Sequence, residues 1–328
     1  MSDLKLNIRD GSKLTKPAIY AGLVVILAAL PLFMTAGYYL HIFIVAFIFI
    51  IATVSLRTIF ISGQLSLAHA AFMAIGGYTS AILAKEFGWT PWVCIPLGGL
   101  MAMFVGILIG YIFARLRMLL FAMLTLLFGI VILEVSSVAG RWTMGYSGLT
   151  GIPALFIGSR VPYYYFFLGL AVVSLLALYR FEFSRIGINL KAIAQSNQAA
   201  ASVGINETAN RVLAMAVGCF FAGLAGAGYA HYTLVLSHAS FSLLQSIYLT
   251  MYMIVGGVGS FAGPIIGAAI LTIIPELFRG LKEFSPFIFA GILLIMVYLM
   301  PQGLVSLPRL IRSAFTKRRE EKRVSHAS

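Results

Sequence analysis

The polar side chains that could act on a ligand are few, and they stand at interruptions of long apolar segments. Gln64, Ser66 and His69 lie in a glycine-containing polar break between two such segments. Broken segments at membrane depth are tolerated only where they are buried in protein or line a cavity. These three side chains could therefore line a passage for a solute, or they could satisfy backbone groups at a helix end, and the sequence leaves both readings open.

Glu134 is the one carboxylate placed well inside an apolar segment. Because a charge at the centre of a bilayer costs about 2.5–3.5 kcal/mol, we expect Glu134 to face the bundle interior and to have a partner. Arg141 is the nearest candidate along the chain. With no second carboxylate beside it, a structural ion pair or a protonated, hydrogen-bonded carboxyl is favoured over a proton relay.

Other kinds of site find little support in the sequence. The glycine-rich run at 256–264 lacks the Lys-Ser/Thr of a phosphate-binding loop and joins two apolar segments, so it predicts a tight turn. Cys94 and Cys219 lie in different apolar segments without metal-ligand or CxxC spacing. We expect no catalytic residue, no cofactor and no metal in this chain.

Composition places the chain in a membrane. Of its 328 residues, 61% are hydrophobic and 10% are charged, and the mean hydropathy is +0.99. Soluble domains are closer to half apolar and a quarter charged. The long continuous apolar runs exclude the alternating pattern of a β-barrel. The sequence therefore predicts an all-α polytopic membrane protein.

A spanning helix needs about 20 mostly apolar residues. By that measure the chain has about ten transmembrane helices, at Pro17–Ala36, Leu40–Ile61, Ala68–Ala84, Pro91–Ala114, Met118–Ala139, Pro162–Tyr179, Val212–His231, Ser242–Gly257, Gly263–Phe278 and Phe287–Met300.

The net charge of +13 is concentrated in four places that fall on one side of a ten-helix topology. Cytoplasmic loops carry the Lys/Arg excess, so both termini are expected to be cytoplasmic, and the charge does not indicate a nucleic-acid partner. We divide the chain into a cytoplasmic segment 1–16, a transmembrane domain 17–304 and a basic cytoplasmic tail 305–328.

Two loops are long: 140–161, expected outside the cell, and 180–211, expected in the cytoplasm. In the second, Ile186, Leu190, Ile193 and Ala194 recur at helical spacing and predict a short helix with one apolar stripe. Gly204 could end that helix in a left-handed conformation. The stripe could lie at the lipid interface or dock into a groove on a cytoplasmic partner.

Rows of small residues at every fourth position mark several apolar segments, and we favour packing within the chain as their role over a subunit seam. The rows are Gly98, Ala102, Gly106 and Gly110; Gly218, Ala222 and Gly226; and Gly259, Gly263 and Gly267.

Four ordered stretches and a closing motif carry a family resemblance. They are Gly63 to Phe72 with Gly76-Gly77-Tyr78, Gly148 to Pro153, Ser184 to Gly187 through Gly204-Ile205-Asn206, Gly256 to Ser260 with Gly263-Pro264, and Pro301 to Leu304. In this set the chain resembles the LivM-type permeases of branched-chain amino acid ABC transporters.

The resemblance implies a transmembrane subunit of an importer in the bacterial inner membrane. Its implied partners are a homologous LivH-type permease, two cytoplasmic ATPase subunits that bind ATP and Mg²⁺, and a periplasmic binding protein. It also implies that Ser184–Asn206 is a coupling helix seated in the ATPase, formed by Ser184, Arg185, Ile186, Gly187, Leu190, Ile193, Ala194 and Gly204.

This chain departs from the family in having fewer charges in that loop, with Asn189, Gln195, Ser196 and Gln198 instead. We therefore expect the apolar stripe to carry the contact with the ATPase. Two alternatives stay open: the same architecture importing urea or short amides, and a stand-alone channel or secondary transporter.

Overall fold

The computed structural model describes residues 22, 24–32, 37–116, 118–277, 291 and 294, without the side chains of residues 141 and 277. The segment 1–16, the closing motif and the tail 305–328 lie outside these residues, as do half of the predicted first span and most of the last. Residues 24–32 are helical.

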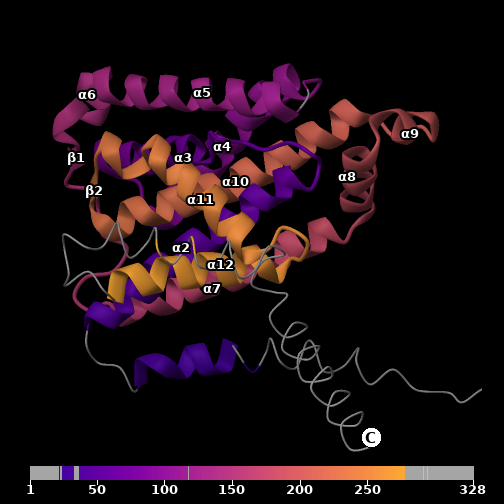
Figure 1. Ribbon diagram of the computed structural model, residues 1–328. Helices are drawn as coiled ribbons and strands as arrows, with labels where there is room; N and C mark the ends of the chain where they lie inside the picture. The colour runs from indigo at the N-terminus through magenta and orange to yellow at the C-terminus, as the bar shows by residue number, and fades with distance from the viewer. Residues whose placement is uncertain are drawn as a thin grey trace, which may run out of the picture.

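The described part of the chain is built almost entirely of helices (Figure 1). Its longer helices are α2 (Gly37–Phe60), α3 (His69–Glu86), α4 (Pro91–Phe113), α5 (Met118–Val138), α7 (Val161–Glu182), α10 (Glu207–Thr233), α11 (Leu243–Gly256) and α12 (Ala262–Leu277). Its short elements are α6 (Gly140–Thr143), η1 (Gly145–Ser147), β1 (Leu149–Thr150), α8 (Arg185–Gln195), α9 (Asn197–Ser202), β2 (Val235–Leu236) and η2 (His238–Phe241).

The eight longer helices match eight predicted spans within a few residues. The largest differences flank the central loop, because α7 continues through Arg180 to Glu182 and α10 begins at Glu207. Glu182 and Arg211 in these polar ends are buried and charged, so the helices extend beyond the apolar stretch that hydropathy detects. Within the described residues, six helices are long and apolar enough to cross a membrane.

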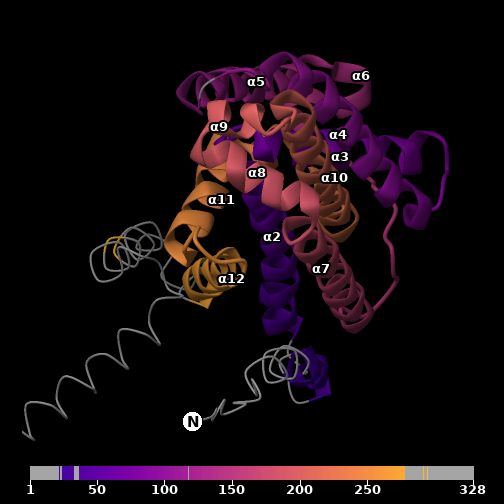
Figure 2. The same ribbon diagram turned by 90° about the vertical axis from the view of Figure 1, so that its right-hand side faces the viewer.

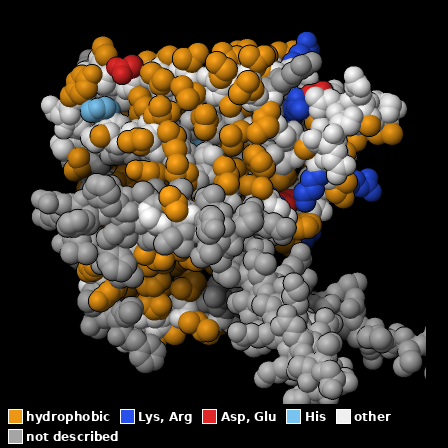
Figure 3. Space-filling view, viewed as in Figure 1, with side chains coloured by type: hydrophobic (Ala, Val, Ile, Leu, Met, Phe, Trp, Pro, Cys, Tyr) orange, Lys and Arg blue, Asp and Glu red, His pale blue; other side chains and the backbone are white. Residues whose placement is uncertain are grey.

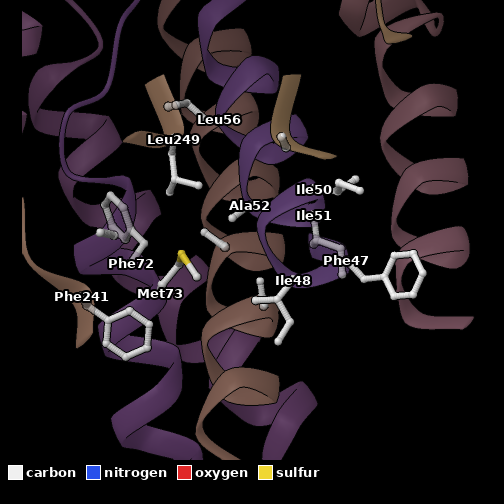
Figure 4. Close-up of a cluster of buried hydrophobic side chains, with 14 of the residues drawn as sticks. Phe47, Ile48, Ile50, Ile51, Ala52, Leu56, Phe72, Met73, Phe241 and Leu249 are labelled. Atoms are coloured by element: carbon white, nitrogen blue, oxygen red, sulfur yellow. The ribbon is translucent and has the colours of Figure 1, made fainter. Parts of the chain in front are cut away.

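Helix α10 lies at the centre of the bundle, in contact with α2, α3 and α4 (Figures 1 and 2). Helix α2 packs in turn against α7 and α12, while α5 covers α3 on the outside. The core draws apolar side chains from most of the long helices, including α7 and α10. Figure 4 shows its part between α2, α3, η2 and α11, with Ile48, Phe72 and Leu249.

The rows of small residues bring these backbones together, as predicted. A Cβ at Gly98 of α4 would overlap the Gly76 carbonyl of α3, and one at Gly106 would stand 2.7 Å from the Cys219 side chain of α10. In the third row, a Cβ at Gly267 of α12 would overlap the Tyr252 carbonyl of α11. Close backbone approach stabilises helix pairs where no hydrophobic effect drives them together.

The two long loops lie at opposite ends of the bundle (Figure 1). At one end, β1 pairs antiparallel with β2, and Leu149 stands opposite Leu236. The Tyr163 hydroxyl accepts hydrogen bonds from the amides of Leu155 and Phe156, at 3.0 and 3.2 Å, which ties the 140–161 loop to α7. At the other end, α8 packs against α7 and α10, and α9 packs against α8 and α10.

Candidate functional site

The short helix α8 is set on the end of α7 by its own sequence. The Ser184 hydroxyl accepts a hydrogen bond from the Gly187 amide and donates one to the Phe181 carbonyl at 2.7 Å, which caps the new helix. A Cβ at Gly187 would overlap the backbone of Glu182. Only glycine at this position allows α8 to fold back so closely over the end of α7.

The apolar stripe of α8 faces the protein interior. Leu190 is fully buried in a cluster with Ile61 of the α2–α3 connection and Ala214 of α10, and Ile186 packs against that cluster. Ile193 is also buried. The expectation that this stripe would meet lipid or an ATPase is therefore wrong for Leu190 and Ile193. A stripe of this kind shows that a helix has an apolar neighbour, and here the neighbour belongs to the same chain.

The opposite side of α8 and α9 is exposed. It presents Arg185, Ala194 and Gln195 together with two large apolar side chains, Ile188 and Val203, which are 62% and 74% exposed. Gly204 has the predicted left-handed conformation, with φ +83°, but it follows α9. The helix that carries the stripe ends earlier, at Gln195, where Ser196 becomes extended and caps α9. Figure 3 shows a mostly hydrophobic face, with Lys and Arg side chains gathered at the α8–α9 end.

A buried acid–base cluster joins α8 to two spanning helices. Glu182, the last residue of α7, accepts a hydrogen bond from the Arg57 guanidinium of α2 at 2.9 Å. The Lys191 ammonium of α8 lies 3.0 Å from the same carboxylate oxygen. Arg57 and Glu182 are buried, whereas Lys191 is half-exposed and also stands over the Phe183 ring.

A second cluster joins α9 to the ends of α4 and α10. Arg211 of α10 donates to the Ala114 carbonyl at 2.9 Å and to the Asn197 side-chain oxygen at 3.3 Å, and it pairs with Glu207 one turn earlier. Asn197 donates to Glu207 at 2.9 Å. Like Arg57, Arg211 is buried.

Gln64 and Ser66, in the 61–68 break, and His69, the first residue of α3, are all buried. Gln64 donates to the Ala114 carbonyl at 3.3 Å, which fits the reading that it satisfies a helix end. The His69 ring shares a 2.8 Å hydrogen bond with the Ser55 hydroxyl of α2. Among the described residues, the Ser66 hydroxyl and the second ring nitrogen of His69 have no hydrogen-bond partner. A role for these residues in a passage stays a prediction.

Glu134 does not face the bundle interior. It is exposed on the outer side of α5, and its carboxylate is 3.4 Å from the Ser137 hydroxyl. The expectation of an inward-facing carboxylate was wrong because α5 is the least buried of the long helices and packs mainly against α3. The Arg141 side chain lies outside the described residues.

The part of the chain that the structure describes holds no group of three or more His, Cys, Asp or Glu side chains able to bind a metal. An open groove of about 680 Å³ lies between α4 and α10 and is lined by residues such as Tyr111, Arg115 and Leu213. It does not include Gln64, Ser66 or His69.

Comparison with protein-family models matches residues 38–301 to the permease component of the branched-chain amino acid transport system. The chain belongs to this family. The permease is 29% identical to the "High-affinity branched-chain amino acid transport system permease protein LivM" of Salmonella typhimurium strain LT2, over 92% of this chain and 77% of that protein. The protein of the same name from Escherichia coli K12 matches with the same identity and coverage. No solved structure matches significantly.

Membership confirms the resemblance read from the motifs and makes this permease a helical, multi-pass membrane protein. Sequence reasoning missed the two buried clusters. Arg57 and Glu182 were not singled out, and Lys191 and Arg211 were counted only as topology charges. Arg57 does carry a local signal, because it is a lone cation in an otherwise apolar helix and such a residue requires a partner.

Proposed function

We propose that this permease is the membrane subunit of an ATP-driven importer for branched-chain or related apolar amino acids. The observation that carries the proposal is the family match, which spans most of the described chain, together with two relatives named as LivM permeases. The helical bundle with a structured pair of short helices at one end supports it.

The proposed topology has about ten transmembrane helices between residues 17 and 304, with both termini on the cytoplasmic side of a bacterial inner membrane. The Lys/Arg distribution supports this orientation. It places the 140–161 loop outside the cytoplasm, the coupling segment within 180–211 inside, and residues 1–16 and 305–328 as cytoplasmic ends.

The proposed partners are a homologous LivH-type permease, two cytoplasmic ATPase subunits and a periplasmic binding protein, within a lipid bilayer and without nucleic acid. ATP and Mg²⁺ would bind to the ATPase subunits, so this chain would contribute neither catalytic residues nor a cofactor. The exposed side of α8 and α9, with Ile188 and Val203, is the surface that we assign to the ATPase.

In this mechanism, closure of the ATPase dimer pushes on α8 and α9 and switches the bundle between outward- and inward-facing states by rigid-body movement. We assign Gln64, Ser66 and His69 to the translocation pathway through the bundle. Glu134 faces away from its own bundle, so it would take part in a passage that runs between this chain and a second permease.

Uptake measurements in the native host test the proposal. Deleting this chain is expected to abolish high-affinity leucine uptake, and restoring it should recover uptake that isoleucine and valine inhibit and urea does not. Inhibition by urea or short amides would instead favour the alternative cargo. Uptake that persists without any ATPase subunit would favour a channel or secondary transporter.

A further inference from the structure

The two buried clusters have the same plan. In each, one polar side chain of a short helix meets a buried charged residue that also binds the end of another spanning helix. Lys191 of α8 meets Glu182 of α7, which holds Arg57 of α2. Asn197 of α9 meets Arg211 of α10, which holds the Ala114 carbonyl at the end of α4.

Anchoring alone does not account for these charges. Helix α8 is already held by Leu190 and Ile193 in the interior and by the Ser184 cap. Replacing a buried ion pair with well-packed apolar side chains is often neutral or stabilising, so the clusters are weak evidence for a purely stabilising role. Hydrogen-bonded pairs, in contrast with apolar contacts, fix both the distance and the direction between two helices.

Both buried arginines also have hydrogen-bond donors without a partner among the described residues. Within the described residues, two of the three guanidinium nitrogens of Arg57 and one of Arg211 are buried without a hydrogen-bond partner. Buried polar groups are ordinarily paired, and each exception needs an explanation. A second arrangement of the helix ends, in which these donors meet other acceptors, provides one.

We propose that Glu182 and Arg211 are positioning residues that transmit movement of α8 and α9 to the spanning helices. Through Glu182, α8 moves the ends of α7 and α2 together. Through Arg211, α9 moves the ends of α10 and α4 together. This inference rests on the proposed function, in which α8 and α9 receive the push of the ATPase.

The test removes the side-chain contacts that α8 and α9 make with the clusters and leaves the buried arginines paired. Lys191→Met removes the tie from α8 but keeps the Arg57–Glu182 pair, and Asn197→Ala removes the tie from α9 but keeps Arg211 on Glu207 and Ala114. Both changed side chains lie at the surface edge of their cluster, so the fold is expected to survive. Lys191→Arg, which retains the charge, serves as a rescue variant.

The matched control is Asn210→Ala, since Asn210 lies one residue from Arg211, is bonded only to the Asn206 carbonyl within the described residues, and reaches neither cluster. Each variant is purified as the full transporter with its permease, ATPase and binding-protein partners and is placed in liposomes. ATP hydrolysis, leucine uptake and the amount of bound ATPase are measured on the same samples.

We expect each single variant to lower the number of leucines imported per ATP about fivefold, and the double variant more than tenfold, which lies within the usual range of coupling between sites. ATPase binding and hydrolysis should stay near the wild-type level, and Lys191→Arg and Asn210→Ala should match the wild type.

If the wild type is active and the double variant imports as many leucines per ATP, the transmission role is overturned and the proposed function still stands. Loss of bound ATPase in the variants would also overturn it, because the side chains would then be part of the partner interface. A wild-type assembly without ATP-dependent leucine uptake would instead count against the proposed function itself.

Discussion

Replacing Gly76 with alanine tests the backbone contacts that hold the bundle together. Gly76 of α3 faces Gly223 of α10, and a Cβ added to it would overlap the Gly223 backbone. No side-chain rotation can relieve this overlap, so α3 and α10 must separate. The prediction is that Gly76→Ala destabilises the permease.

The magnitude follows from two opposing terms. Alanine in place of glycine in a helix interior gains about 1 kcal/mol. Overpacking a close contact costs typically about 1–3 kcal/mol, and more when the structure cannot adjust. The added Cβ meets backbone atoms of a central helix, so we place the overpacking cost at the upper end of this range. After the gain in helix propensity is subtracted, the free energy of unfolding should fall by about 2 kcal/mol.

Gly169→Ala is the matched control. Gly169 is exposed in the interior of α7, and a Cβ there would meet no atom within 4 Å. This variant should be neutral or more stable by up to about 1 kcal/mol, since only the helix-propensity term acts.

The measurement is the folded fraction of purified protein in mild detergent as temperature or the mole fraction of a denaturing detergent is raised. The free energy of unfolding should be about 2–3 kcal/mol lower for Gly76→Ala than for Gly169→Ala. Equal stability of the two would refute the claim that these helices pack backbone to backbone.

Three further predictions use the same unfolding assay. Glu182→Ala leaves its arginine partner buried and unpaired and should cost about 3–5 kcal/mol, whereas Lys191→Met removes a half-exposed partner and should cost less than about 1 kcal/mol. Leu190→Ala should cost about 2–5 kcal/mol and Ile188→Ala on the exposed side of α8 almost nothing; equal costs would contradict the inward direction of the stripe. Tyr163→Phe leaves two loop amides without their hydrogen-bond acceptor and should lower the free energy of unfolding by about 1–3 kcal/mol. Proteolysis in the 140–161 loop should also be faster; unchanged cleavage would show that the hydroxyl does not hold the loop.

Much of the helical architecture was predictable because long apolar segments leave the chain little choice in lipid. The ends of the eight matched helices shifted by only a few residues where polar ends such as Glu182 continue a helix. The rows around Gly98 and Gly267 also indicated close packing within the chain, because small residues at every fourth position share one helix face and allow another backbone to approach it.

The direction of individual side chains was harder to predict. The stripe containing Leu190 required an apolar neighbour, but periodicity does not say whether that neighbour is lipid, another protein or the same chain. Glu134 was expected to face inward because a charge in the bilayer is costly, but α5 is the least buried of the six candidate spans and leaves this carboxylate exposed. Arg57 and Glu182 are 125 residues apart, so their pairing is a property of the packed bundle that no local pattern reveals.

Purification of the tagged chain from its native membranes, followed by mass spectrometry of what accompanies it, tests the central claim most directly. A homologous permease and ATPase subunits should co-purify, and the ATPase should be lost when the exposed Ile188 and Val203 are both changed to aspartate. A chain that emerges alone as a stable homo-oligomer would contradict the importer assignment.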